Sequence, residues 1–157
     1  MQLFESRQCR DRAASLFSEW KVKIEAKVPF AIVEHVGSTA IHGALTKGDI
    51  DLYVEVPRET HAAAISIIET MGFKVKQDTH RDSELCMLEH HDITDLAIQV
   101  VARGSKYSLF LKFRDALNRN KHLVAQYNAL KQSSVDVTQE QYREIKSQFI
   151  KGVIGDL

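Results

Sequence analysis

Residues 49–56, DIDLYVEV, alternate between polar and apolar side chains along the whole segment. Successive side chains of a β-strand point to opposite faces of its sheet, so this pattern predicts a strand with one buried face and one polar face. The buried face would carry Ile50, Leu52, Val54 and Val56, and the polar face Asp49, Asp51, Tyr53 and Glu55. The chain must therefore form a sheet that packs an apolar layer on one side.

The polar face of this strand has two interpretations. Either it meets water, as in many half-buried strands, or Asp49 and Asp51 converge on a cation. Side chains two residues apart in a strand share a face, with Cα atoms roughly 6.5–7 Å apart. Mg²⁺ takes oxygen ligands and usually binds one or two carboxylates, with water and phosphate completing its shell. A bound cation would also relieve the repulsion between two neighbouring ionised aspartates.

Phosphoryl transfer by two metal ions normally uses a third carboxylate from a neighbouring strand. Asp95 is the candidate, because it opens the segment DLAIQVVA, which has the same alternation as residues 49–56. Asp92 is the alternative if that strand begins earlier. The register of the sheet decides between them.

Gly37 and Ser38 stand eleven or twelve residues before Asp49, where an apolar strand gives way to a turn and a new helical start. Glycine lets a ligand approach the backbone closely, and unpaired amides beside a serine hydroxyl suit a phosphate group. Lys47, just ahead of the aspartates, could add a positive contact to a triphosphate. The alternative for Lys47 is a surface lysine in a loop. His35 and His42 flank the turn, and packing is the commoner role for histidines in such places.

Hydropathy patterns predict helices and strands over the rest of the chain. Apolar residues three or four apart predict a helix over 5–26, and further helices are expected over 58–72, 106–117, 121–132 and 139–154. Ser105, Asn120 and Thr138 are the expected caps of the last three. Strands are expected over 29–36, 49–56, 73–77, 83–90 and 95–102, the last two as a hairpin. The fold class is α+β: a small mixed β-sheet, helices packed on one face, and a helical C-terminal third.

Length and charge limit the classes of function. The 157 residues, 44% hydrophobic and 27% charged, suit one domain over residues 1–157 with a proper core. Lysine plus arginine equals aspartate plus glutamate at 21 each, so no overall field attracts nucleic acid or an anionic membrane.

Cysteine spacing and hydropathy indicate the compartment. Cys9 and Cys86 lack the partners of a zinc or redox motif and are expected to be buried thiols in a reducing environment. No apolar run approaches the roughly 20 residues that span a bilayer, and the first residues lack a signal-peptide core. We expect a cytoplasmic protein without membrane contact; the sequence does not indicate its oligomeric state.

The segment VEHVGSTAIHGALTKGDIDL resembles the GrpB family, which carries a very similar EHxGSTAxxGLxxK…D pattern. The likeness continues into KFRDALNRNKHLVAQYNALK and YREIKSQFI. More broadly, a strand, Gly-Ser, a spacer and Asp-x-Asp resemble the signature of nucleotidyltransferases with the DNA polymerase β fold. The resemblance implies an active-site cleft that includes Gly37, Ser38, Asp51 and Asp49.

The chain also departs from the family pattern. Relatives tend to carry an apolar residue in place of Asp49, a proline in place of Gly48, and two histidines where Ala97 and Gln99 stand here. The Asp-x-Asp motif is thus more complete than in near relatives. Asp95 could compensate for the missing histidines.

These features together predict a metal-dependent nucleotidyltransferase that moves a nucleoside monophosphate from an NTP, such as ATP, to a hydroxyl. Asp49, Asp51 and Asp95 would bind Mg²⁺ or Mn²⁺ and act in catalysis, and Gly37, Ser38 and Lys47 would bind the nucleotide. The acceptor, a small molecule, a protein or an RNA end, is left open. Two alternatives remain: a non-catalytic module that binds a nucleotide or a coenzyme A-like ligand, and a structural domain whose polar face has no ligand.

Overall fold

The computed structural model describes residues 2–155. The α-helices are α1 (Ser6–Lys27), α2 (His61–Glu69), α3 (Leu109–Asn118), α4 (Lys121–Ser133) and α5 (Gln139–Ile154). The strands are β1 (Phe4–Glu5), β2 (Ile32–Val36), β3 (Leu45–Thr46), β4 (Ile50–Val56), β5 (Phe73–Val75), β6 (Leu85–His90) and β7 (Leu96–Ala102). Short 3-10 turns cover Ser38–Ala40, Arg58–Thr60 and Lys106–Ser108.

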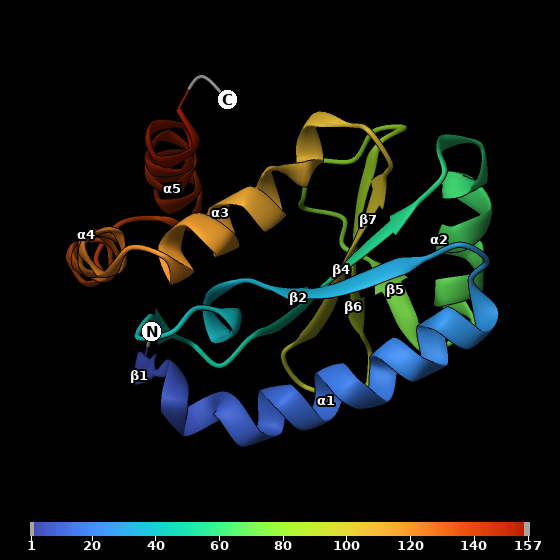
Figure 1. Ribbon diagram of the computed structural model, residues 1–157, viewed down its shortest axis with the longest axis horizontal. Coiled ribbons are helices and arrows are strands. Elements are labelled where there is room, and N and C mark those ends of the chain that lie inside the picture. Colours follow the sequence, from blue (N-terminus) through green and yellow to red (C-terminus); the bar gives the residue numbers. More distant parts are fainter. Residues whose placement is uncertain (1, 156–157) are drawn as a thin grey trace.

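Five strands form a mixed sheet in the order β2-β4-β7-β6-β5 (Figure 1). The central strands β4 and β7 are parallel, and every other neighbouring pair is antiparallel, including the predicted β6–β7 hairpin. The predicted α+β class with a small mixed sheet is confirmed. A separate two-stranded ribbon, β1–β3, was not predicted, because two-residue strands are too short to show a periodicity.

Helices α1 and α2 cover the apolar face of the sheet. The residues of β4 and β7 predicted to face inward do so, and they pack with Trp20 and Ile24 of α1 and Ile68 of α2 in one core. The first helix begins with a capping box formed by Glu5 and Gln8. This layer matches the expectation from the alternating and helical patterns.

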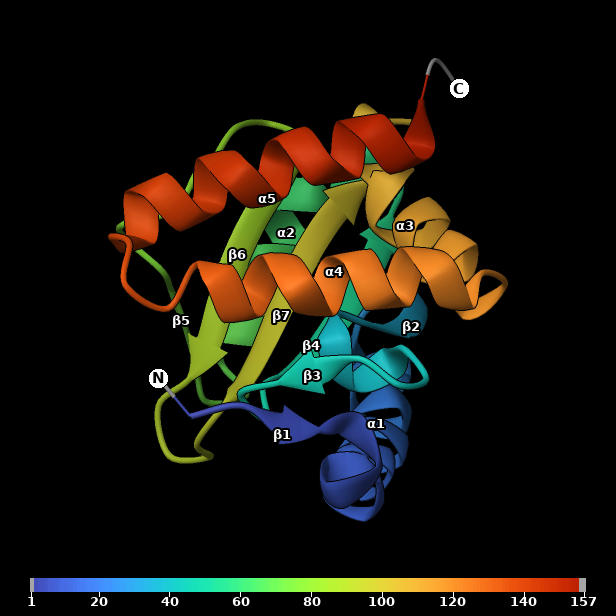
Figure 2. The same ribbon diagram turned by 90° about the vertical axis from the view of Figure 1, so that its left-hand side faces the viewer.

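The C-terminal helices form a second layer on the other side of the sheet, with α4 and α5 crossing in front of it (Figure 2). Their own core joins Phe113, Tyr127 and Phe149 to Ile41 and Ala44 of the loop after β2. Around Tyr53 and at the carboxyl end of β7, the second face of the sheet is closed by an apolar cluster contributed by the start of α3 and the turn before it. Near Asp51, the same face is lined by hollows instead of a packed core.

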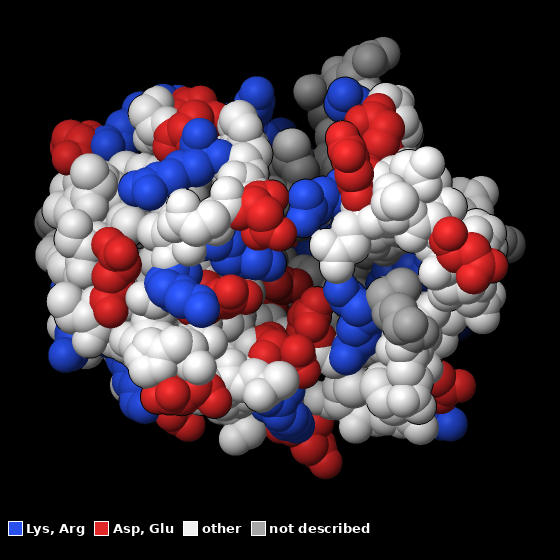
Figure 3. Space-filling model, turned by 180° about the vertical axis from the view of Figure 1, so that it is seen from behind, with Lys and Arg blue, Asp and Glu red and all other residues white. Residues whose placement is uncertain are grey.

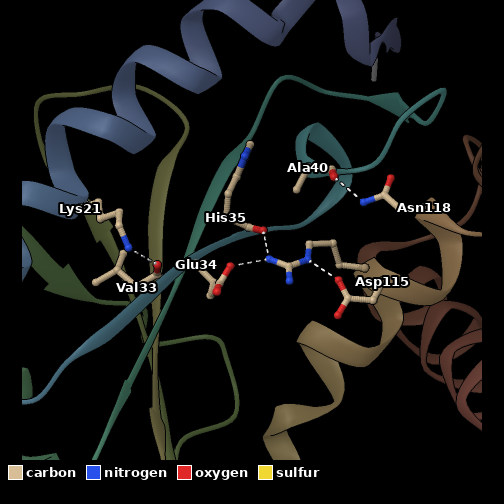
Figure 4. Close-up of polar contacts among 8 residues, drawn as sticks. Lys21, Val33, Glu34, His35, Ala40, Asp115 and Asn118 are labelled. Atoms are coloured by element: carbon tan, nitrogen blue, oxygen red, sulfur yellow. Dashed lines mark hydrogen bonds and ion pairs between the residues drawn. The ribbon is translucent and has the colours of Figure 1, made fainter.

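Polar contacts of α3 fix this layer to the edge strand β2 (Figure 4). The Arg114 guanidinium donates to the Glu34 carboxylate and to the carbonyl oxygen of His35, each at 2.9 Å, and to Asp115 at 3.0 Å. Asn118 donates to the carbonyl of Ala40 at 3.1 Å. These contacts tie α3 directly to the strand and the turn that carry the Gly-Ser motif.

Several boundaries differ from the sequence-based expectation. The strand expected from residue 29 begins at Ile32, because Phe30 has a left-handed φ of +60° that breaks the extended chain. Asn120 and Thr138 cap their helices as predicted, whereas Ser105 caps a 3-10 turn that precedes α3. Cys86 is buried and Cys9 is half-buried, and both are free thiols. In the described part of the chain, every helix is too short or too polar to cross a membrane.

Candidate functional site

Asp51 lies in the middle of the sheet, between Val36 of β2 and Ala97 of β7. Asp49 precedes β4, which begins at Ile50. Burial, and next the charge of Asp49, raise the pKa of Asp51 to about 6. The site thus disfavours the ionisation of Asp51, and a cation placed beside the two carboxylates would reverse this effect.

Gly37 contacts the carboxylate of Asp51. The glycine has a φ of +81°, and a Cβ atom built on it would lie 2.3 Å from Oδ2 of Asp51. Any larger residue would therefore displace the carboxylate and would also strain the backbone. The structure brings the Gly-Ser turn and the second aspartate together, as the sequence suggested.

A chain of hydrogen bonds fixes the loop that carries Asp49. The Thr39 hydroxyl donates to the carbonyl oxygen of Asp49 at 2.9 Å, and Nε2 of His35 lies 2.9 Å from the same hydroxyl. Since the Thr39 proton is already used, Nε2 of His35 is the donor. Burial and the charge of Arg114 lower the pKa of His35 to about 4, so its ring is neutral at neutral pH. His35 is therefore a packed, positioning histidine.

Ser38 is held beside this loop. Its hydroxyl donates to Oγ1 of Thr46 at 2.7 Å, and the Gly48 amide donates to the same oxygen at 3.0 Å. The lone pairs of Ser38 remain available, and a rotation of its hydroxyl would let it donate to a ligand. The two turns on either side of β3 are thus joined through one threonine.

A small hollow of about 90 Å³, here called the helix pocket, lies between this loop region and the C-terminal helices. Its lining includes both aspartates and the polar residues Ser38, Lys47, Tyr127, Lys131, Tyr142 and Lys146. Lys47 lies beside Asp49, with its Nζ 3.6 Å from Oδ2. Three lysines therefore surround a space next to two carboxylates.

Lys131 is a buried site residue that the sequence analysis missed. Its side chain is buried, donates to the carbonyl oxygen of Leu45, and has its Nζ 4.0 Å from the ring centroid of Tyr127. Burial, followed by the charges of Lys146 and Lys47, lowers its pKa to about 7. A sequence signal exists: Val124, Tyr127 and Lys131 lie at helical spacing, which puts a lysine on an apolar stripe.

A larger hollow of about 380 Å³, here called the strand pocket, also includes Asp49 and Asp51. It extends over the ends of β5, β6 and β7, and its other charged residues are Lys74, Lys76, Glu89, Asp92 and Asp95. The two pockets therefore meet at the two aspartates. In Figure 3, acidic and basic side chains gather along the furrow between the sheet and the C-terminal helices.

Asp95 lines the strand pocket but does not belong to β7, which begins at Leu96. It has a left-handed φ of +66°, and its carbonyl oxygen accepts a hydrogen bond from Ile50 at 2.7 Å. This conformation takes Asp95 out of the strand alternation that we expected. Asp92 lines the same pocket, and its Oδ1 lies 3.0 Å from Nδ1 of His91. Within residues 2–155, no three His, Cys, Asp or Glu side chains form a group that could hold a metal ion.

The residues present fit a cation held by two protein carboxylates. Asp49 and Asp51 supply oxygen ligands, and Mg²⁺ commonly takes one or two of these with water and substrate phosphate. Ala97 leaves no side chain long enough to reach the site from the adjacent position on β7. The site thus has two carboxylates, and the adjacent position on β7 supplies no third ligand.

Solved structures share this fold. The crystal structure of the conserved protein GrpB from Enterococcus faecalis superposes with a TM-score of 0.71 at 19% identity, covering 96% of this chain and 98% of that chain. The Cid1 poly(U) polymerase bound to MgGTP gives 0.59 at 13% identity, and a cytoplasmic RNA terminal U-transferase gives 0.55 at 14%. These two matches cover 84% and 78% of this chain, but only 44% and 38% of the matched polymerase and transferase chains. The fold is therefore nucleotidyltransferase-like.

Sequence comparison identifies the family. A UPF0157 protein of Vibrio cholerae is 40% identical over 155 residues, which are 99% of this chain and 82% of the relative. A UPF0157 protein of Deinococcus radiodurans is 28% identical over 145 residues, which are 91% of this chain and 76% of the relative. The model of the family described as GrpB protein matches residues 7–155. The chain therefore belongs to the GrpB family, as the residues around Gly37 and Ser38 had indicated.

Proposed function

We propose that this protein is a metal-dependent nucleotidyltransferase that transfers a nucleoside monophosphate from an NTP to a hydroxyl group. The observation that carries the proposal is the meeting of two pockets at Asp49 and Asp51, with one pocket lined by three lysines. The fold shared with the Cid1 poly(U) polymerase and a terminal U-transferase supports the same chemistry. A site that joins carboxylates to a basic hollow suits a metal nucleotide complex.

Asp49 and Asp51 would hold Mg²⁺ or Mn²⁺. The metal would neutralise phosphate charge and polarise the reacting phosphoryl group. Gly37 keeps the Asp51 carboxylate in place, because only a hydrogen atom fits between them. The chain from His35 through Thr39 to the Asp49 carbonyl holds the other ligand. These neighbours pre-organise the two carboxylates before any ligand binds.

The helix pocket would bind the phosphate tail. Lys47, Lys131 and Lys146 supply positive charge there, and Ser38 supplies a hydroxyl next to Gly37. Because the pKa of Lys131 is about 7 when the pocket is empty, only part of its amines carry a proton at neutral pH. A bound triphosphate would favour the charged form. Lys131 and Lys146 come from the C-terminal helices, so nucleotide binding would draw the two layers together.

In the proposed reaction, the acceptor oxygen forms a bond with the α-phosphorus of the NTP. The bond from the α-phosphorus to the bridging oxygen of the β-phosphate breaks, and pyrophosphate leaves. The hydroxyl proton passes to a carboxylate, for which Asp95 is the candidate because it lines the same pocket as the pair. Catalysis by this chain would then consist mainly of positioning and charge neutralisation.

One observation favours the alternative of a non-catalytic nucleotide-binding or coenzyme A-like ligand-binding module. Ala97 occupies the position next to Asp51 on the neighbouring parallel strand, from which a third carboxylate could reach the metal directly. A site with two carboxylates could bind a metal nucleotide without turning it over. The experiment must therefore separate binding from transfer.

The test uses each NTP, UTP and ATP included, labelled at the α-phosphate, with Mg²⁺ or Mn²⁺ and separate pools of small molecules, RNA and protein. Asp51→Asn should abolish metal-dependent label transfer, whereas Asp11→Asn, a change on the exposed side of α1, should match wild type. Nucleotide binding in a thermal-shift assay without transfer to any pool would support the binding module. A melting temperature that does not respond to nucleotide and metal would leave only the structural domain.

A further inference from the structure

The strand pocket offers a second binding region that the phosphate tail of an NTP would not fill. It shares Asp49 and Asp51 with the helix pocket but extends the other way, over the ends of β5, β6 and β7. Its volume of about 380 Å³ lies in the range of small-molecule sites, roughly 300–1,000 Å³. The pair of carboxylates therefore has one hollow on each side.

The sheet register explains why this hollow exists. Asp51, Ala97, Glu89 and Lys74 are successive partners across β4, β7, β6 and β5, so their side chains lie in one row on one face. Ala97 is the smallest member and stands between two carboxylates. Neighbouring strands are about 4.8 Å apart, so Asp51 and Glu89 are separated by roughly 10 Å, with little side chain between them.

Lys74 and Lys76, at the β5 edge of the sheet, give positive charge to the wall of the strand pocket that lies away from Asp51. Lys76 follows β5, is half-buried, lines the pocket, and its charge reaches Asp51 strongly enough to oppose the rise in the pKa of that carboxyl. Lys74 lines the same wall from within β5. Among the described residues, neither ammonium group has a carboxylate oxygen within 4.0 Å. These two charges are placed to receive an anionic group.

We infer, on the basis of the proposed function, that the strand pocket binds the acceptor, and that the acceptor is a small hydroxyl compound carrying a phosphate group. The attacking and leaving oxygens of phosphoryl transfer lie roughly in line, so a tail in the helix pocket requires an acceptor from the opposite side. The phosphate group of the acceptor contacts Lys76 and Lys74, and its hydroxyl oxygen forms the new bond to the α-phosphorus at the carboxylate pair.

The charges of the pocket favour a small acceptor over a polynucleotide. Glu89, Asp92 and Asp95 line the same hollow, and such carboxylates repel a chain of phosphates while leaving room for one phosphate at the two lysines. The whole chain has a formal net charge of zero, so it offers no general attraction for RNA. The acceptor recognised by this pocket therefore carries a single anionic group near its hydroxyl.

The test compares matched compounds: glycerol 3-phosphate with glycerol, ribose 5-phosphate with ribose, and a 15-nucleotide RNA with a free 3′ end. Binding of each is measured by calorimetry without nucleotide, and label transfer is measured with NTP and Mg²⁺. The variants are Lys76→Met, Lys76→Arg and, as a matched control on the exposed end of α1, Lys27→Met. Thermal melting of each variant establishes that it is folded.

We expect at least one phosphorylated compound to bind about tenfold more tightly than its unphosphorylated partner. Lys76→Met should weaken that binding about tenfold, Lys76→Arg should restore most of it, and Lys27→Met should match wild type. Equal binding within each pair, an unchanged affinity in a folded Lys76→Met, or a preference for the RNA would overturn the inference. Failure of the proposed function would give a different result from failure of this inference. The phosphorylated compounds would still bind more tightly in calorimetry, but no label would be transferred to them.

Discussion

The two faces of the sheet come from the same strands but have opposite physical characters. On one face, Leu52 and Ile98 are fully buried beneath α1 and α2. On the other, Asp51 stands next to Ala97 and opposite the lysines of the C-terminal helices. Asp51 and Leu52 are consecutive residues of β4, yet Asp51 faces a hollow lined by charges and Leu52 faces a closed apolar core.

This contrast shows how the fold separates stability from chemistry. The apolar face gains free energy from removing hydrocarbon from water, and nearly all of its buried side chains are hydrocarbon. The polar face holds carboxylates and ammonium groups at close range in a partly buried space, which costs free energy unless a ligand compensates. A ligand that supplies the missing charge would therefore offset this cost.

Truncation on the apolar face should give the largest effect. Leu52→Ala removes a fully buried side chain, and we expect a loss of about 2–5 kcal/mol in the free energy of unfolding. Urea unfolding followed by circular dichroism measures it. Val22→Ala, at a position that is 69% exposed on α1, is the control and should change little. A loss below about 1 kcal/mol for Leu52→Ala would contradict the description of this face as the core.

On the polar face, removing a charge should stabilise the apoprotein. The pKa of Asp51 rises from 3.8 to about 6 on folding, so ionisation destabilises the folded state. The resulting contribution to stability is complete below pH 3.8 and is lost as the pH rises through about 6. Asp51→Asn should therefore raise the free energy of unfolding at pH 7.5 by about 1–3 kcal/mol, and less at pH 5.

Urea unfolding at both pH values, with and without Mg²⁺, checks this prediction. Added Mg²⁺ should stabilise wild type and the control Asp11→Asn at pH 7.5 but leave Asp51→Asn unchanged. A destabilised Asp51→Asn apoprotein would mean that the Asp51 carboxylate is already compensated within the protein.

His35 should make the polar side sensitive to acid. Its pKa falls from 6.5 to about 4 on folding, so its contribution to stability is present above pH 6.5 and is lost as the pH falls toward 4. His35→Gln should reduce that loss by about 1–2 kcal/mol. Unfolding measured from pH 7 to pH 4 tests it, with His122→Gln on the exposed side of α4 as control. Parallel pH profiles for wild type and His35→Gln would disprove the assignment.

The smallest effect concerns the helix that carries Lys131. The Asn120 side chain accepts hydrogen bonds from the amides of His122 and Leu123 at the start of α4. Asn120→Ala should lower the free energy of unfolding by about 1 kcal/mol. Gln126→Ala, an exposed change within α4, is the control for urea unfolding. A loss as large as that of Leu52→Ala would show that α4 and the apolar core form one cooperative unit.

Much of the fold could be predicted because it depends on local patterns. The alternation over residues 49–56, the stripe of the first helix and the caps at Asn120 and Thr138 each depend on residues close in sequence. The GrpB resemblance of the segment around Gly37 was also sufficient to identify the family. Boundaries were less accurate where a backbone conformation such as that of Phe30 ended an element early.

The site was predictable in its motif but not in its surroundings. Gly37 and Asp51 could be paired from the family pattern, although their direct contact depends on how β2 and β4 align. The position of Asp95 outside β7 depends on its left-handed backbone, which a polar and apolar pattern does not encode. The contribution of Lys131 required the packing of α4 against the loop after β2.

By itself, the sequence determined the α+β class, the apolar and polar faces of β4, and membership of the GrpB family, because periodicity and motif spacing are local properties of the chain. Only the tertiary structure decided that Asp49 and Asp51 lie where two pockets meet, with lysines of α4 and α5 on one side and of the β5 edge on the other. The physical reason is that charges far apart in sequence interact through distance and burial, and both are set by the packing of the sheet against its helices.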